Sequence, residues 1–175
     1  MKTPTGREVF FDPRDLIVSK TDLKGRITYA NKVFQHVAGY TEAELLGQPH
    51  SIIRHPDMPR CAFKLVWDTI QAGEEIFAYV INMTKTGDHY WVLAHVTPSF
   101  DAAGAIVAYH STRRVPDPKV VQGTIVPLYR KLKAIEDAEA NRKEGMMNGF
   151  AALVAILNDA GIGYDAFVAS LAGTT

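Results

Sequence analysis

The 175-residue sequence contains a single cysteine, Cys61. One thiol excludes an internal disulfide framework and any zinc or iron–sulfur site built from several cysteines. An unpaired cysteine is typical of a reducing compartment, so we expect a cytoplasmic location.

Long apolar runs and net charge are also missing. The longest apolar run covers 150–157, whereas a membrane span needs about 20 residues. The N-terminal residues lack the apolar stretch of a signal peptide. Because 19 basic residues balance 19 acidic ones, a basic nucleic-acid-binding surface is not expected. We therefore expect no membrane span and no nucleic-acid partner.

Hydrophobic residues make up 47% of the sequence, which is enough for a packed core. Pro116 and Pro118 separate a mixed N-terminal part from a helical C-terminal part. We predict an N-terminal cap at 1–15, a main domain at 16–115 and an amphipathic helical segment at 116–175.

The main domain reads as α+β. Turn residues at 22–25 predict a hairpin at 16–30, and Thr41 with Glu44 forms a capping-box pattern. Further strands are expected at 76–83, 90–97 and 106–112, after helices at 31–37, 41–47 and 59–72. This order predicts a five-stranded antiparallel sheet with short helices on one face, enclosing a small-molecule pocket.

Residues 90–97 carry bulky apolar side chains at both odd and even positions. Alternate residues of a strand point to opposite faces, so both faces of the sheet should be covered. The candidates for the outer cover are 128–135, the pair Phe10 and Phe11, and a second subunit.

Several motifs resemble the PAS domain of bacterial aerotaxis receptors. The segments 29–31 (YAN) and 39–41 (GYT) are general to PAS domains, whereas 54–59 (RHPDMP) and 87–92 (GDHYWV) are specific to the aerotaxis subgroup. The resemblance covers about 16–115 and implies the PAS fold. It also implies non-covalent FAD binding, redox or oxygen sensing, and no enzymatic activity.

The resemblance implies a cofactor site, residue by residue. Arg54, with its forked cationic side chain, suits a phosphate. Asn82 suits the polar edge of the isoalloxazine ring, because flipping its amide exchanges donor for acceptor. The family usually has tryptophan where this chain has Phe77, which keeps an aromatic wall but lacks an indole donor. The full set of cofactor-binding candidates is Asn31, Arg54, His55, Asp57, Phe63, Trp67, Phe77, Asn82 and Trp91.

Each candidate also has a simpler structural interpretation. Phe63 and Trp67 lie at helical spacing and could be core residues. Asp57 could cap a helix, Arg54 could form a surface ion pair, and Asn31 could hold the loop after the hairpin.

Other ligands compete with FAD as the occupant of the pocket. Haem b, bound through a single axial histidine, would make the chain a PAS gas sensor; the conceivable ligands are His36, His55, His95 and His110. A metal site at His50, His55 and Asp57 fits no recognised pattern. A flavin adduct on Cys61 is not expected, because its sequence setting differs from that of photosensor cysteines. A ligand-free interaction module and a small flavin reductase complete the alternatives.

The helical segment suggests an output. Apolar residues recur at helical spacing in 125–135 and 150–157, on either side of a charged stretch at 136–144. Two such stripes suit contact with a signalling partner or a homodimer, or simple packing against the main domain. The last residues, 172–175, read as a loose tail.

Overall fold

Five strands form one antiparallel sheet in the computed structural model, which describes residues 3–172. The spatial order is β2-β1-β5-β4-β3, so the first hairpin pairs with the last strand and β3 forms one edge. The strands are β1 (Ile17–Thr21), β2 (Ile27–Ala30), β3 (Ile76–Met83), β4 (His89–Phe100) and β5 (Ile106–Arg114). The predicted α+β class and five-stranded sheet are confirmed.

Short helices connect β2 to β3. They are α1 (Lys32–Ala38), α2 (Glu42–Leu45), the 3₁₀ turn η1 (His50–Ile53) and α3 (Arg60–Gln71). The predicted capping box starts α2, since Thr41 and Glu44 exchange both side-chain-to-backbone bonds. Gly39 ends α1 in the left-handed conformation, which glycine adopts without steric cost.

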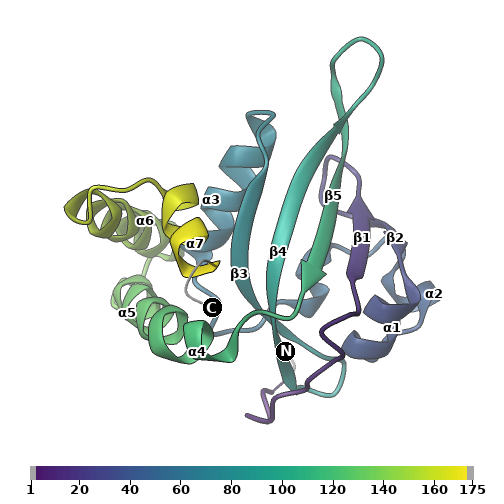
Figure 1. Ribbon diagram of the computed structural model, residues 1–175, viewed down its shortest axis with the longest axis horizontal. Helices are drawn as coiled ribbons and strands as arrows, with labels where there is room; N and C mark the ends of the chain where they lie inside the picture. Colours follow the sequence, from purple (N-terminus) through teal and green to yellow (C-terminus); the bar gives the residue numbers. More distant parts are fainter. Residues whose placement is uncertain (1–2, 173–175) are drawn as a thin grey trace.

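Strands β4 and β5 are longer than the alternating sequence pattern predicted. Strand β4 continues to Phe100, through Pro98, and β5 continues to Arg114. This extension adds Arg113 to the sheet, opposite Ala94 of β4. The longer β4–β5 hairpin projects beyond the other strands (Figure 1).

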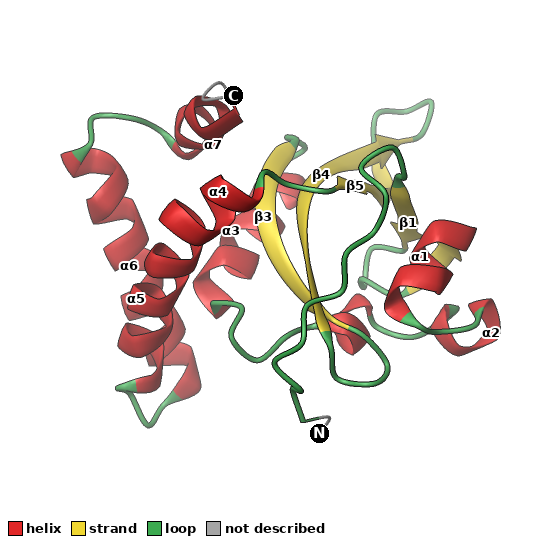
Figure 2. Cartoon of the chain, turned by 60° about the horizontal axis from the view of Figure 1, so that its bottom comes forward, coloured by secondary structure: helices red, strands yellow, loops and turns green. Residues whose placement is uncertain are grey.

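The C-terminal helices lie at the β3 edge of the sheet, beside α3, whereas α1 and α2 lie at the opposite edge (Figures 1 and 2). The β3 edge of the sheet therefore lies next to the C-terminal helices as well as to α3. These elements are α4 (Pro118–Val120), the π-helical turn η2 (Val121–Ile125), α5 (Val126–Asp137), α6 (Arg142–Asp159) and α7 (Tyr164–Ala172).

Helix α5 covers part of the outer sheet face, as the alternating pattern of β4 predicted. Tyr129 packs against the ring of Trp91 and donates its hydroxyl to the carbonyl of Tyr79. The N-terminal segment also contacts the sheet, because Val9 donates to the carbonyl of His89. Phe77, further along the same outer face, stays exposed.

Within residues 3–172, none of the helices alone has the length and apolar composition of a membrane span; only α6 and α7 together, bent by 69°, meet that test. The predicted tail at 172–175 lies almost wholly outside the described residues, as do the first two residues of the predicted cap. The division of the chain at 15/16 and 115/116 stays a prediction.

Candidate functional site

A cavity of about 230 Å³ lies between the inner face of the sheet and the helices η1 and α3. Its floor is hollow because Ala78 of β3 pairs directly with Ala94 of β4, and both side chains are small. Helix α3 supplies the opposite wall through Phe63 and Trp67. The ring of Trp67 meets Tyr109 edge-on, with centroids 5.5 Å apart. The edge strand β3, its neighbour β4 and helix α3 thus hold the cavity open.

Four of the predicted site residues meet in this cavity. They are Arg54, Phe63, Trp67 and Asn82. Asn82 is 3% exposed and lines the cavity, and its side-chain amide makes no hydrogen bond to the residues that the structure describes. Arg54 lies across the face of the Phe63 ring, 4.1 Å from its centroid. The Asn82 amide is not among the fully enclosed polar groups that lack a partner, so it borders the cavity and is open to a ligand or water.

Asn31 does not line the cavity. Its side-chain oxygen caps α1 by accepting from the backbone N–H of Phe34 and also accepts from that of Val18, while its amide donates to the carbonyl of Leu16. Both ends of this amide are therefore used within the fold. The alternative that Asn31 holds the loop after the hairpin is confirmed.

Phe77 and Trp91 lie on the outer face, which corrects their prediction as cavity walls. Phe77 is 40% exposed and stacks on His95. Trp91 packs against Tyr129 of α5. The reason is the two-residue period of a strand: Phe77 is five residues from Asn82, so the two side chains point to opposite faces.

His55 and Asp57 also lie outside the cavity, in a separate hollow between the outer sheet face and α5. The ring of His55 is buried, and its Nδ1 accepts the backbone N–H of Asp57 at 3.2 Å. The Asp57 carboxylate is 80% exposed and does not cap α3, whose N-cap residue is Pro59. Both interpretations of Asp57, as a cavity residue and as a helix cap, are corrected.

Sequence reasoning missed Arg113, the most unusual residue of the cavity. The residue is 2% exposed, and its guanidinium faces no carboxylate among the described residues. It donates to the hydroxyl of Ser19, lies 3.5 Å from Nε2 of His50, and sits over the ring of Phe34. Burial lowers the pKa of Arg113 to about 10, so at neutral pH it stays charged.

His50 completes this polar corner of the cavity. Burial, followed by the nearby charges of Arg113 and Arg54, lowers the pKa of His50 to about 3. The imidazole is therefore neutral at pH 7. Because a guanidinium only donates, His50 accepts at Nε2 and carries its proton on Nδ1. The local sequence signal for this corner was an arginine at an inward-facing strand position.

The residues considered for haem, for a metal ion and for a flavin adduct differ in whether they line the cavity. Of the histidines considered for haem, His110 lines the cavity, whereas His36, His55 and His95 do not. The described part of the chain contains no group of three side chains that could hold a metal ion. Burial, and then Glu136, raises the pKa of Cys61 to about 12. This thiol stays protonated and lies outside the cavity lining.

The sequence of the chain is similar to those of several known proteins. Residues 27–113 match the family model described as PAS fold. The aerotaxis receptor of Escherichia coli K12 is 45% identical over 119 residues, which are 67% of this chain and 23% of the receptor. The nitrogen fixation regulatory protein of Klebsiella pneumoniae is 30% identical over 97 residues, 55% of this chain and 20% of that protein.

Solved structures agree on the fold. The dark structure of the blue-light photoreceptor Aureochrome1 LOV superposes with a TM-score of 0.58 at 20% identity, over 66% of this chain and 86% of its own. The light-state dimer of the fungal photoreceptor Vivid gives 0.51 at 23% identity, over 60% and 82%. The chain spans only about a quarter of the aerotaxis receptor's length.

Proposed function

The chain contains a PAS sensory domain related to that of the bacterial aerotaxis receptor, and on this premise we propose that it binds FAD non-covalently and senses redox state or oxygen. It has no enzymatic role in this proposal. Its site is the cavity lined by Arg54, Phe63, Trp67 and Asn82. The chain acts in the cytoplasm and relays the flavin's state to a signalling partner or a second copy through its C-terminal helices.

The observation that carries the proposal is the buried guanidinium of Arg113, which faces no carboxylate among the described residues. A buried cation without an anion is destabilising, so it favours an electron-rich ligand in the cavity. One-electron reduction adds negative charge to a flavin ring. Arg113 is placed to stabilise that charge, while the neutral His50 beside it adds no competing charge.

The remaining cavity residues have complementary roles. Asn82 offers both a donor and an acceptor from a buried amide, which suits the polar edge of an isoalloxazine ring. Phe63 and Trp67 offer aromatic walls. Arg54 is exposed at the cavity's rim and can donate to a phosphate. The cavity volume of about 230 Å³ lies below the roughly 300–1,000 Å³ of pockets that hold whole drug-sized ligands, so in this proposal only the ring system enters it and the phosphates lie at the rim.

A visible spectrum of the purified protein tests the proposal. We expect flavin absorbance at about 450 nm that bleaches with dithionite, and FAD released on denaturation. A Soret band would instead indicate haem b and a gas sensor, and a colourless protein that takes up no added FAD would indicate a ligand-free interaction module.

Two aromatic substitutions locate the site. Trp67→Ala removes a cavity wall and should lose most of the flavin. Phe77→Ala removes a ring of similar character from the outer face and should keep it. If both variants retain full FAD stoichiometry, the cavity is not the site.

A further inference from the structure

The first turn of α3 is capped by a carboxylate from α5. Glu136 is fully buried, and its two oxygens accept the backbone N–H groups of Arg60 at 3.0 Å and Cys61 at 2.7 Å. The N-cap residue of α3, Pro59, provides no side-chain capping bond. Glu136 therefore satisfies helix donors that would otherwise be left unpaired, and its charge complements the positive end of the helix dipole.

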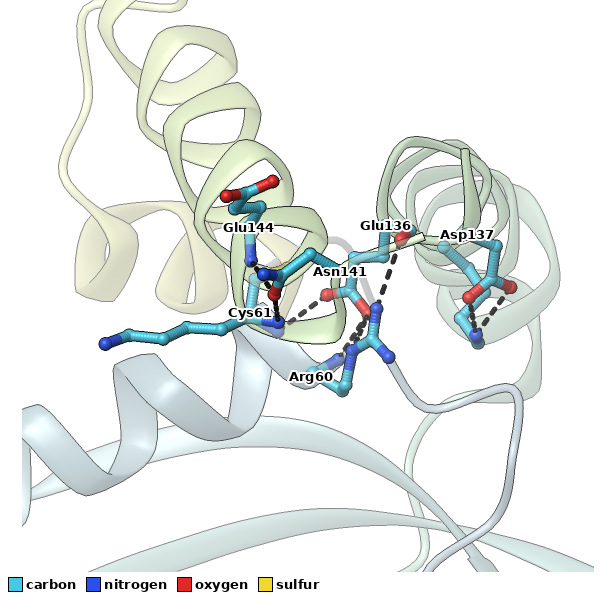
Figure 3. Close-up of polar contacts among 8 residues, drawn as sticks. Arg60, Cys61, Glu136, Asp137, Asn141 and Glu144 are labelled. Atoms are coloured by element: carbon cyan, nitrogen blue, oxygen red, sulfur yellow. Dashed lines mark hydrogen bonds and ion pairs between the residues drawn. The ribbon is translucent and has the colours of Figure 1, made fainter. Parts of the chain in front are cut away.

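The side chain of Arg60 also reaches back to Glu136. Its Nε lies 3.2 Å from the Glu136 carboxylate, and its terminal nitrogen donates to the backbone carbonyl of Glu136 at 3.1 Å (Figure 3). One residue of α5 is thus held by the first two residues of α3, across 76 positions of sequence. We call this contact, formed by Arg60, Cys61 and Glu136, the α3–α5 joint.

Helix α6 packs directly on the joint because it has glycine at the two contact positions. A Cβ at Gly145 would lie 2.2 Å from the Glu136 carbonyl oxygen, and one at Gly149 would lie 2.8 Å from the Glu136 side chain. Neither glycine has a positive φ that would require it. Close approach is therefore their physical reason, and the joint connects three helices.

The joint lies on the helix that forms the wall of the cavity. Phe63 follows Arg60 by one helical turn, and Trp67 follows by two. A helix moves largely as a rigid unit, so a shift of these rings is transmitted to the capped end of α3. The structure shows the buried carboxylate bonded to this end of α3, so a displacement of that end must either carry α5 along or break these bonds. Breaking them leaves a buried charge unsatisfied, which is costly.

We propose that the α3–α5 joint couples the cavity to the C-terminal helices: Glu136 docks α5 and α6 on α3 and transmits changes at the cavity to them. The redox part of this inference rests on the proposed function; the docking part does not. Glu136 acts as a positioning residue, since it touches neither the cavity nor its contents.

Hydrogen–deuterium exchange on the purified holoprotein tests the coupling. In the wild type we expect exchange in α5 and α6 to differ between the oxidised and the dithionite-reduced protein. Glu136→Gln keeps the side-chain size but replaces one acceptor with a donor and removes the ion pair. It should keep the flavin and its bleaching, speed exchange in α5 and α6 about ten- to a hundredfold, and abolish the redox difference.

A control and a second variant sharpen the result. Asp137→Asn changes the neighbouring residue, whose described ion pair is with Lys133 of the same helix, and should behave like the wild type. Gly149→Ala leaves every charge in place but pushes a methyl group toward Glu136. It should loosen the joint as Glu136→Gln does, so an effect of charge alone is distinguished from an effect of docking.

Three outcomes overturn the inference. The first is a Glu136→Gln exchange pattern equal to that of the wild type. The second is a wild-type flavin that bleaches while exchange in α5 and α6 stays unchanged. If the protein proves colourless, the proposed function and the redox coupling fail together, and docking is then read from the apoprotein. There, equal exchange in the wild type and Glu136→Gln is the third outcome, whereas faster exchange in the variant supports docking.

Discussion

Filling the cavity from its floor distinguishes ligand binding from a closed interaction module. Ala94 is 4% exposed, lies on a central strand and points into the cavity opposite α3. Ala94→Leu places three additional carbons in this space. The variant should lose flavin, because the added side chain occupies the position where a ring would lie between Ala94 and Trp67.

The same substitution should stabilise the apoprotein. Three buried carbons at about 0.8 kcal/mol each contribute roughly 2 kcal/mol, slightly reduced by lost rotamer freedom. For a chain of this size that corresponds to a rise in Tm of about 4–8 °C. The wild type instead should gain from ligand, by about 2.7 kcal/mol at a free FAD concentration a hundredfold above Kd.

Thermal melts with and without added FAD, read together with the visible spectrum, measure both effects. We expect Ala94→Leu to melt above the wild type without FAD and to show no further rise with it. Ala108→Leu, the same change on β5 at a position outside the cavity lining, should bind flavin normally. An Ala94→Leu protein that binds FAD at wild-type stoichiometry would refute the cavity as the site.

Three further predictions concern titratable groups. Arg113→Gln should make the flavin's one-electron midpoint potential more negative, by roughly 65–130 mV if the lost electrostatic stabilisation is about 1.5–3 kcal/mol; an unchanged potential in a dye-coupled reduction would place the guanidinium away from the ring. Cys61, with its pKa raised to about 12 by burial, should resist a thiol reagent at pH 8 in the native protein and react on unfolding, and rapid native labelling would contradict its burial. The Lys85 ion pair and the Thr41 bonds lower the pKa of Glu44 from 4.5 to about 2, so they stabilise the fold above pH 4.5 and this contribution is lost as pH falls through 2; Glu44→Gln should therefore lower Tm at pH 7 but not near pH 2, and a Tm difference that persists at low pH would disprove this linkage.

The two-residue period of a strand could have shown from the sequence that Phe77 and Asn82 do not share a face. Once Asn82 is taken as facing inward, Phe77 must face outward, because the two lie an odd number of positions apart. Trp91 faces outward for a related reason, since it pairs with Ile81 and shares its face. The identity of the inner face could thus have been extended from one residue to its neighbours, but only after one residue was placed.

The amino-acid sequence by itself determined the local features. Short-range patterns predict the capping box of Thr41 and Glu44, the end of α1 at Gly39 and the succession of helices and strands along the chain. Each of these depends on residues that are close together in the sequence. The motifs also pointed to the right fold and to four of the residues that meet in the cavity.

The sequence alone also excluded an internal disulfide, because the chain has a single cysteine. Only the tertiary structure showed the surroundings of that thiol, where Glu136 reaches the backbone of Cys61 from 75 positions away. It alone revealed that Arg113 is buried without a carboxylate among the described residues. Burial and long-range partners depend on how distant segments pack, and no local pattern encodes that packing.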